Sequence, residues 1–526
     1  MTKTAQRTTP VTSGSRGDGA IQRFKARFVV AGYNMQEGVD YGYGTSPTML
    51  GPTFRYVLAR AARKRHAVRI IDFKNAFVQA VLKVPMYVRQ PPGYEDPGMV
   101  VKCIRNLYGS GAGPRLYSEH MDRLLLSMGF ERSGTDCCLY VRPTDGVTLG
   151  SHVDDNVVSA PTDAAIDAFK EELIRGGAAF TDESTENAKL LGVRIRRARD
   201  GSIRLDQSQY IRDMLAKFEL DSLKPQSTPS TKYKRADVPN REGSDELPVH
   251  RLQGNLLWIA SQTRPDIAHA VSRTARMAAD SAVRQLMWTA LMRICAYLKA
   301  TQDQCLVYHA GCKRGWPRAM AFVDADWAGD ESRRSTTGFV LCYNGAPIMW
   351  SAKLQTTGKK AVTNLPAMSS GEAEYNALAY ATREVASFRN LMYHCDDHAT
   401  ETPITGDIKW AATPPILWRN RFDFTFDGEL RAPTDKDAAP TTILSDATAA
   451  ISMAYNPITT KTRHVQLRAH FVKAAVSYLL CRILKVDTKY QIADPLTKPV
   501  DKSCCESFRS FMDGETQYPE TTIIYS

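Results

Sequence analysis

The chain has 526 residues, of which 43% are hydrophobic and 24% are charged, and this composition excludes fibrous and wholly disordered proteins. Its length predicts about three domains. The formal net charge of +12 and the pI near 9.1 are typical of proteins that bind phosphate-rich partners, although many basic proteins bind no nucleic acid.

The first part of the chain predicts a tail, a helix and a strand. Residues 1–19 are rich in Thr, Ser and Gly and predict a disordered tail. Residues 53–66 place apolar side chains at helical spacing and predict a packing helix. This helix leads into a short apolar strand, residues 68–72, that ends in the carboxylate of Asp72.

Residues 147–158 predict a β-hairpin with Asp154 and Asp155 at its tip. Because neighbouring side chains of a strand point to opposite faces, only one of the two acids can face a given ligand squarely. An acidic pair in a loop is more often a solvated turn. If the strand that ends in Asp72 lies beside the hairpin, however, Asp72 and Asp154 can share divalent cations, which bind hard oxygen ligands and suit phosphate chemistry.

The middle of the chain predicts helices and a connector. We expect Asp163 to cap a helix over residues 164–174. The segment 224–248 is polar and rich in proline, which predicts a connector. Three amphipathic helices are predicted beyond it, with a Pro-at-N1 helix start within residues 263–266; they cover residues 252–259, 266–278 and 283–300.

Four acids of the last third of the chain stand at predicted strand ends and helix starts. The predicted strand over residues 319–324 ends in Asp324, and a second strand covers residues 335–341. Glu374 lies on the first turn of a predicted helix, residues 372–385. Asp446 follows a strand, and Asp494 lies at a helix start. Four such acids can together hold two Mg²⁺ ions that activate water and stabilise a leaving 3′-oxygen, whereas each acid alone is an ordinary surface residue.

The eleven cysteines give no framework, because their number is odd and no CxxC spacing occurs. This argues against a zinc site and against structural disulfides. We find no apolar run of about 18 residues and no signal peptide. We therefore expect an intracellular protein, cytoplasmic or nuclear, that is not secreted and contacts no membrane.

More than ten ordered motifs resemble those of copia-type retrotransposon reverse transcriptases. The first group is KARFVVAGYNMQEGVDY, DFKNAF, YVRQPPGY, LYG before PR, SMGFERSGTDCCLYV, HVDD, LLGVRI, LDQSQYI and KPQSTP. The second group resembles the family's C-terminal ribonuclease H region and comprises SQTRPDIAHAV, YLKAT, DADWAGD, STTGFV, SSGEAEYNALA and IADPLTKP. Together they span roughly Phe24 to Ser510.

The resemblance implies a fold and a domain order. It implies an α+β right-hand polymerase with fingers, palm and thumb, followed by an α/β ribonuclease H-like domain. The predicted helices after the connector then form a thumb and connection region that holds the template and primer, or a packing domain without nucleic acid contact. The expected boundaries are 1–19 disordered tail, 20–223 fingers and palm, 224–317 linker and thumb or connection, 318–510 ribonuclease H-like domain and 511–526 tail.

The resemblance also implies an activity, an RNA-directed DNA polymerase with ribonuclease H. Its expected partners are an RNA template, a DNA primer, an RNA–DNA hybrid and deoxynucleoside triphosphates, and each active site is expected to use two Mg²⁺ ions. The implied catalytic and metal-binding residues are Asp72, Asp154 and Asp155 for synthesis, and Asp324, Glu374, Asp446 and Asp494 for cleavage of the RNA strand.

Four further residues are implied to bind the nucleotide or the template. Phe77 is similar to the aromatic residue that lies under the sugar of the incoming nucleotide and excludes a 2′-hydroxyl; the alternative is core packing. Arg115 could meet a phosphate. Lys25 and Arg27 could contact the template or the incoming triphosphate, or could lie on a solvated strand face.

Several positions depart from the family's pattern. Residues 110–113 replace its leucine, lysine, glutamine and alanine with a loop poor in side chains, which weakens preorganisation for the nucleotide. His152 replaces a tyrosine and is expected to be partly charged near neutral pH. Lys485 replaces a histidine that assists product release, and Gln466 replaces an aspartate.

Two segments, 356–368 and 395–442, are longer than in the family. These departures leave an alternative open, namely a decayed, catalytically inactive retrotransposon remnant that at most binds nucleic acid.

Overall fold

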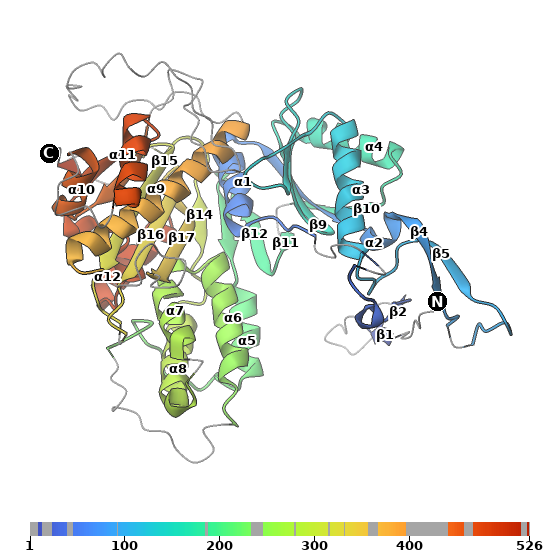
Figure 1. The fold of residues 1–526 in the computed structure, drawn as a ribbon, viewed down its shortest axis with the longest axis horizontal. Coiled ribbons are helices and arrows are strands. Elements are labelled where there is room, and N and C mark those ends of the chain that lie inside the picture. The colour runs from blue at the N-terminus through green and yellow to red at the C-terminus, as the bar shows by residue number, and fades with distance from the viewer. Residues whose placement is uncertain are drawn as a thin grey trace. The chain divides into compact units, whose positions relative to one another are not determined.

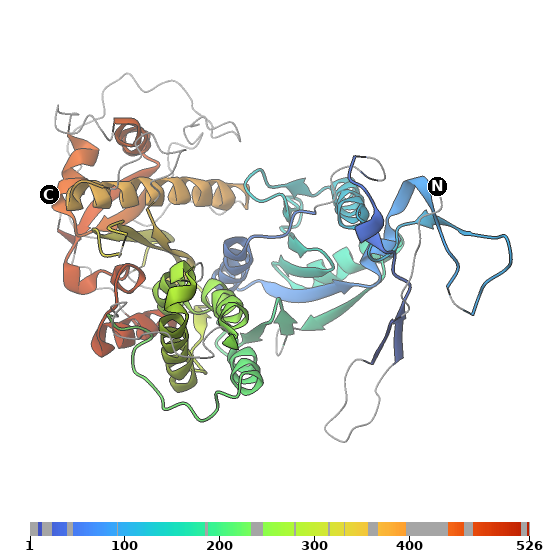
Figure 2. The ribbon, with the colours of Figure 1, turned by 60° about the horizontal axis from the view of Figure 1, so that its bottom comes forward.

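The computed structural model describes most of the chain, and every structural statement concerns the described residues. They are residues 9–12, 24–38, 41, 46–91, 93–184, 188–232, 246–277, 280–313, 316–330, 332–355, 367–395, 440–456, 466–516 and 523–524. The chain divides into two compact units (Figures 1 and 2). Unit 1 comprises Met1–Leu50 and Ala67–Ser184, and unit 2 comprises Gly51–His66 and Thr185–Ser526.

Unit 1 is built on an antiparallel sheet of six strands in the order β10-β3-β9-β8-β7-β6. Alternate side chains of the central strands, such as Ile71, Phe73 and Val158, form a core with the helices α3 and α4. The bounds are β3 (Ala67–Phe73), β6 (Glu131–Arg132), β7 (Leu139–Val141), β8 (Thr148–His152), β9 (Asp155–Ala160), β10 (Phe180–Ser184), α3 (Gly113–Ser127) and α4 (Asp163–Arg175).

Two smaller antiparallel ribbons belong to the same unit. One pairs β1 with β2, and the other pairs β4 with β5 (Figure 1). Val88 and Cys103 of the second ribbon are buried against Val30. The bounds of these elements are β1 (Thr9–Thr12), β2 (Phe24–Arg27), η1 (Gly32–Asn34), α2 (Ala76–Gln79), β4 (Val81–Val88) and β5 (Val101–Arg105).

After Thr185, unit 2 continues with a four-stranded antiparallel sheet and a group of helices. The helices share one hydrophobic core. Leu252, Leu256, Val271 and Leu291 are fully buried in that core. The bounds are β11 (Ala188–Leu190), β12 (Val193–Arg197), β13 (Ile203–Asp206), β14 (Leu306–Tyr308), α5 (Ser208–Lys217), α6 (Val249–Gln262), η4 (Pro265–Ile267), α7 (Ala268–Met277), η5 (Ser281–Val283) and α8 (Arg284–Ala300).

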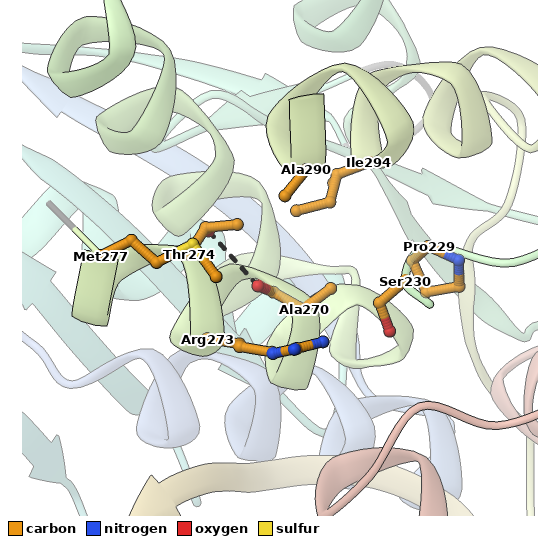
Figure 3. A pocket seen from close by; sticks show the side chains of 8 residues that line it. All are labelled: Pro229, Ser230, Ala270, Arg273, Thr274, Met277, Ala290 and Ile294. Atoms are coloured by element: carbon orange, nitrogen blue, oxygen red, sulfur yellow. Dashed lines mark hydrogen bonds between the residues drawn. The ribbon is translucent and has the colours of Figure 1, made fainter. Parts of the chain in front are cut away.

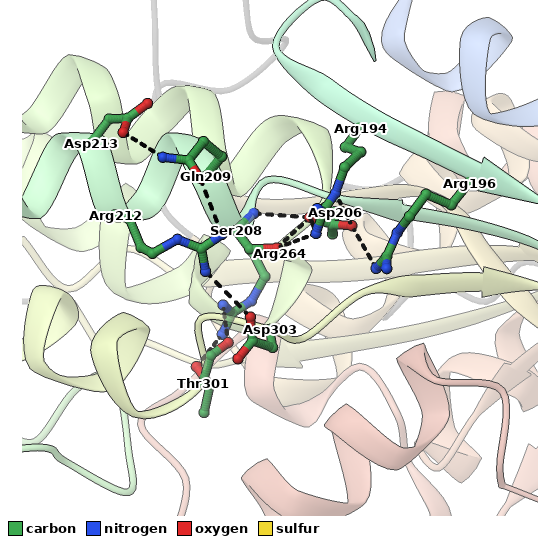
Figure 4. A network of polar contacts seen from close by, with 10 residues as sticks. All are labelled: Arg194, Arg196, Asp206, Ser208, Gln209, Arg212, Asp213, Arg264, Thr301 and Asp303. Atoms are coloured by element: carbon green, nitrogen blue, oxygen red, sulfur yellow. Dashed lines mark hydrogen bonds and ion pairs between the residues drawn. The ribbon is translucent and has the colours of Figure 1, made fainter. Parts of the chain in front are cut away.

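A polar network joins this sheet to the helices (Figure 4). The buried carboxylate of Asp206 accepts hydrogen bonds from Arg194, Arg196 and Ser208, and these bonds hold the pKa of Asp206 below its ordinary value although burial alone would raise it. Arg264 is fully buried and binds Asp266 at 2.7 Å. Because both buried charges have partners, the network is structural.

The second sheet of unit 2 has six strands in the order β17-β16-β15-β18-β19-β20. Its β15 pairs in parallel with β18, which pairs in parallel with β19, while the other pairings are antiparallel. Helix α9 lies along this sheet (Figure 1). The bounds are β15 (Ala319–Asp326), β16 (Thr336–Tyr343), β17 (Ala346–Leu354), α9 (Ser370–His394), β18 (Thr441–Ser445), α10 (Thr448–Tyr455), α11 (Gln466–Ser477), β19 (Cys481–Val486), η7 (Thr488–Tyr490), η8 (Asp494–Leu496), α12 (Lys502–Met512) and β20 (Ile523–Ile524).

Helix α1 (Gly51–Lys64) belongs to unit 2, although the residues on both sides of it belong to unit 1. Its Tyr56 packs edge-on against Tyr343 and Phe388. The guanidinium of Arg55 is buried, lies 4.0 Å from the ring centre of Trp350 and donates hydrogen bonds to the carbonyls of Ile348, Ser261 and Gln262. The helix is therefore an integral part of that core.

Most predicted elements are present, and four details were wrong. Residues 9–12 of the predicted disordered tail form β1, which pairs with β2. Thr162, not Asp163, caps α4 by accepting a hydrogen bond from Ala165, because Asp163 pairs with Arg69. Strand β15 continues past Asp324 to Asp326. Glu374 is not on the first turn of α9, because that helix begins at Ser370.

Several predictions fall on residues outside the described part. They concern most of the two long segments, residues 356–366 and 396–439, and the side chain of Gln466. The expected domain boundaries stay a prediction. Among the described helices, none is both long and apolar enough to cross a membrane.

Candidate active sites

The first candidate site lies where β3 and β9 of unit 1 pair. The register places Asp72 opposite Asp155, so both side chains leave the same face of the sheet. Asp154 lies in the two-residue turn between β8 and β9, and its carbonyl accepts a hydrogen bond of 2.9 Å from the Phe73 amide. The predicted adjacency of the strand and the hairpin is therefore confirmed.

The turn that carries Asp154 is strained. Val153 has a φ of 63°, which is unusual for a β-branched residue because its side chain clashes with the backbone there. Strain of this kind costs about 1–3 kcal/mol and persists only where the surroundings enforce it. Asp72 and Asp154 are exposed, and Asp155 is half-buried. The tip thus presents carboxylates to solvent on a fixed backbone.

Tyr117 lies near these acids, and Phe77 packs against it. The ring of Phe77 packs edge-on against Tyr108 and Tyr117, with centroid distances of 5.5 and 6.0 Å. Burial raises the pKa of Tyr117 well above its ordinary value, and the carboxylates of Asp154 and Asp72 add to the effect. The Tyr117 hydroxyl is buried without a hydrogen-bond partner among the described residues.

His152 differs from its prediction. It lies on β8 directly opposite Asp155 and is half-buried. Burial lowers its pKa below the ordinary value, although a backbone hydrogen bond and Asp154 oppose the change. The lowered pKa favours the neutral imidazole and so opposes the partial charge that was expected.

The second candidate site lies in unit 2 at the ends of β15 and β18. Carboxylate oxygens of Asp324, Glu374 and Asp446 all lie within 4.8 Å of one another. Asp324 comes from β15, Glu374 from α9, and Asp446 directly follows β18. The sheet and the helix packed on it thus gather three of the four predicted acids.

The fourth acid, Asp494, lies at the start of η8 beside the other three. The turn it begins packs directly on β16, where a Cβ on Gly338 would lie 2.5 Å from Thr497 and 2.8 Å from the carbonyl of Ala493. Gly338 is the register partner of Asp324. A glycine is therefore required at this position for the turn to approach Asp324.

The electrostatics of the second site favour a bound cation. Burial raises the pKa of Glu374 to about 9, and repulsion from Asp324 and Asp446 adds to it. Burial and the Asp494 carboxylate raise the pKa of Asp324 to about 6. One oxygen of Glu374 and one of Asp494 are buried without hydrogen-bond partners among the described residues. Hard oxygen donors that are crowded, buried and unpaired fit a divalent cation.

Two residues of the same segment hold this site together. The hydroxyl of Thr497 donates a hydrogen bond of 2.6 Å to Asp324, and the ammonium of Lys498 lies 3.1 Å from an oxygen of Asp494. Although burial lowers the pKa of Lys498, the carboxylates of Asp324 and Asp494 raise it above its ordinary value. Lys498 is therefore a permanent positive charge in the acidic site.

The structure gives fewer contacts for the other residues that were predicted to bind the nucleotide or the template. Arg115 lies on α3 and pairs with Glu119 at 2.8 Å. Lys25 and Arg27 lie on β2, but their side chains are outside the described part. Their roles stay predictions.

Two other features of the described residues resemble sites. Ligand atoms of Asp136, Cys137 and Cys138 also lie within 4.8 Å of one another, but both oxygens of Asp136 already accept hydrogen bonds from the amides of Leu50 and Cys138. A hollow with a cavity volume of about 10 Å³ lies between α7, α8 and Pro229 (Figure 3). It is smaller than the ligand pockets of about 300–1,000 Å³ that are usual in proteins.

Comparisons with known proteins agree with this geometry. Residues 9–232 match the family described as "Reverse transcriptase (RNA-dependent DNA polymerase)". The chain is 30% identical over 322 residues to a Ty5-1 transposon protein of Saccharomyces cerevisiae, and the match covers that whole protein. This chain belongs to the reverse transcriptases of copia-type retrotransposons. It is also 29% identical to the "Retrovirus-related Pol polyprotein from transposon RE1" of Arabidopsis thaliana, over 95% of this chain.

The retrotransposon chain is similar to a part of its longer relatives. It is 27% identical to the corresponding polyprotein from transposon TNT 1-94 of Nicotiana tabacum, over 93% of the chain. The matches cover 31% of the Arabidopsis protein and 34% of the Nicotiana protein, so the chain spans about a third of their length.

Sequence reasoning missed three residues of this reverse transcriptase chain. They are Tyr117, Thr497 and Lys498, which touch or face the predicted acids. Thr497 and Lys498 stand in the quoted motif IADPLTKP, three and four residues after Asp494. That spacing is the signal that could have identified them.

Proposed function

We propose that the chain is an RNA-directed DNA polymerase with ribonuclease H activity. In this proposal unit 1 provides the fingers and palm of a right-hand polymerase, α5 to α8 a thumb or connection, and the β15 to β20 sheet a ribonuclease H-like domain. The observation that supports synthesis most is the register that sets Asp72 beside Asp155, with Asp154 in the adjoining turn, inside the matched residues 9–232.

The geometry of unit 1 supports the chemistry of nucleotide addition. Asp72, Asp154 and Asp155 would hold two Mg²⁺ ions, which when bound supply charge neutralisation for the attacking 3′-hydroxyl and the leaving pyrophosphate. The strained hairpin fixes Asp154 at the primer end. Phe77, held between two tyrosine rings, would lie under the sugar of the incoming deoxynucleotide, and Arg115 would meet its phosphates.

The geometry of unit 2 supports cleavage of RNA in a hybrid. Asp324, Glu374 and Asp446 would hold Mg²⁺ beside the scissile phosphate, and Thr497 orients Asp324 by its hydrogen bond. The net charge of +12 supports binding of template, primer and hybrid through their phosphates, with an affinity that falls steeply as salt rises.

One observation favours the alternative, a remnant that only binds nucleic acid. A Cβ on Gly111 would lie 2.5 Å from the Tyr41 ring, and a Cβ on Gly113 would lie 2.7 Å from Asn106. The loop that replaces the family's polar segment therefore packs tightly on its neighbours and has no space for that segment's side chains unless Tyr41 moves.

Primer extension tests the proposal. The chain is given a poly(rA) template, an oligo(dT) primer and Mg²⁺, and is compared with Asp154→Asn and with Asp167→Asn, an exposed aspartate of α4. We expect extension that Asp154→Asn abolishes and Asp167→Asn leaves unchanged. No extension by a folded chain that still binds the hybrid would support the remnant instead.

A further inference from the structure

The second site contains a positive charge of its own. From the sequence, its four acids were expected to hold two Mg²⁺ ions. The structure brings ligand oxygens of Asp324, Glu374 and Asp446 within 4.8 Å of one another, and Asp494 is not part of that group. Asp494 instead binds the ammonium of Lys498 at 3.1 Å.

The position of Lys498 is fixed by its neighbours in the chain. Thr497 bonds Asp324, and its methyl group lies against Gly338 of β16. Gln491 extends the attachment by donating a hydrogen bond of 3.0 Å to the carbonyl of Val323 on β15. The backbone that carries Asp494 and Lys498 is therefore attached to the strand that carries Asp324.

The charge of Lys498 acts on the whole acidic group. Its ammonium interacts with the carboxylates of Asp324 and Asp446 as well as with Asp494. The side chain is 42% exposed, whereas that of Asp494 is 15% exposed. A divalent cation placed at Asp494 would have to displace this ammonium or lie beside it against repulsion.

We propose that Lys498 supplies the second positive charge of this site, so that the acids of unit 2 bind one divalent cation instead of two. The inference rests on the proposed ribonuclease H function and deepens it. The cation lies among Asp324, Glu374 and Asp446, and the Lys498 ammonium takes the place of a second ion at Asp494. As a compact charge with three N–H donors, it can bind a non-bridging oxygen of the hybrid's phosphate.

Counting bound Mn²⁺ tests the inference without relying on activity. The free ion is measured by electron paramagnetic resonance during titration of the full chain. The parent protein carries Asp72→Asn and Asp154→Asn to remove the ions of unit 1. We expect one ion per parent chain and two per chain with Lys498→Met. Adding Asp494→Asn to Lys498→Met should return the count to one.

Two controls separate the charge from other effects of substitution. Lys498→Arg keeps the charge and should bind one ion. Lys502→Met removes another lysine that pairs with an acid four residues away, Glu506, and should also bind one ion. Circular dichroism and thermal unfolding show whether each variant is folded.

The possible counts have distinct meanings. Two ions in the parent, or one ion in the folded Lys498→Met variant, overturns the inference and leaves the proposed nuclease standing. No ion in the parent contradicts the metal site itself, and then both proposals fail. The dependence of the hybrid cleavage rate on Mg²⁺ concentration gives a second readout. The reaction order in Mg²⁺ should be one for the parent and two for Lys498→Met.

Discussion

The two groups of carboxylates are positioned in different ways. In unit 1, Asp72 and Asp154 are exposed at a strained turn, and no three acids there are gathered within 4.8 Å in the described structure. In unit 2, Asp324 is 4% exposed and lies in a tight group with Glu374 and Asp446. Backbone geometry positions the acids of unit 1, whereas in unit 2 buried packing does so.

This difference has an energetic consequence. Exposed carboxylates are solvated and cost the fold little, but buried carboxylates that repel one another destabilise it unless a cation is present. We therefore expect metal binding to be coupled to stability in unit 2 and to be nearly independent of stability in unit 1.

Replacing one acid of each group with asparagine should give the largest effect on activity. Asp324→Asn should lower the rate of hybrid cleavage by more than about 100-fold and leave primer extension intact. Asp154→Asn should do the reverse. Loss of a residue that contacts the metal only indirectly typically lowers activity by about 10–100-fold. Both activities are measured on one labelled RNA–DNA hybrid. Loss of both activities in either variant would show that the two groups are not separate sites.

Phe77→Ala tests the aromatic neighbour of the first group. If Phe77 lies under the incoming sugar, its removal should lower discrimination against ribonucleotides by about 10–100-fold, because steric rejection depends on the missing ring. Incorporation of each nucleotide is compared in single-turnover extension. Unchanged discrimination in an active enzyme would leave Phe77 as a packing residue between its two tyrosines.

Glu374→Gln tests the cost of burying the second group. The pKa of Glu374 is about 9 in the folded chain against an ordinary 4.5, so the folded state holds the proton more tightly. Stability of the metal-free protein should therefore fall as pH rises from about 5 to 9. Glu374→Gln should flatten this dependence and raise the unfolding midpoint at pH 8 by a few degrees.

The measurement is thermal unfolding with EDTA and with Mg²⁺ at several pH values. Mg²⁺ should restore the stability of the unaltered chain at high pH and have little effect on Glu374→Gln. Asp154→Asn serves as the exposed counterpart and should not change the pH dependence. A chain whose metal-free stability is flat between pH 5 and 9 would contradict the buried, repelling group.

Lys485→His should give the smallest effect. Lys485 lies on β19 opposite Ser445, the residue before Asp446, and so stands near the second group. A histidine there should raise turnover of hybrid cleavage a few-fold by assisting product release, with little change in the Mg²⁺ requirement. Steady-state and single-turnover rates separate release from chemistry. If neither the steady-state nor the single-turnover rate rose in an active nuclease, position 485 would have no role in product release.

Local pattern located the elements that carry the acids, whereas the resemblance of the ordered motifs supplied their roles. Alternation located β3 and the hairpin, which carry Asp72 and Asp154, and helical spacing located α9, which carries Glu374. The cap of α4 could not be predicted in this way, because Asp163 forms an ion pair with Arg69, a residue distant in the sequence. The lowered pKa of His152 also depends on burial, which no local pattern reports.

The pairing of Lys498 with Asp494 was missed although the two residues stand four apart, a spacing that would have indicated it. The assignment of α1 to unit 2 could not be predicted, because it depends on contacts with strands more than a hundred residues later.

The dependence of α1 on later parts of the chain affects folding during protein synthesis. The helix leaves the ribosome long before its partners, because β13 begins at Ile203, β14 at Leu306 and β17 at Ala346. Until those strands are synthesised, Arg55 and Tyr56 have no packing surface, and at about 5–20 residues per second the wait lasts many seconds. Residues 185–526 therefore cannot complete the fold of unit 2 on their own, because they need α1, which is synthesised much earlier. Gene copies that stop before residue 185 would leave α1 permanently unpaired and available to chaperones or to aggregation.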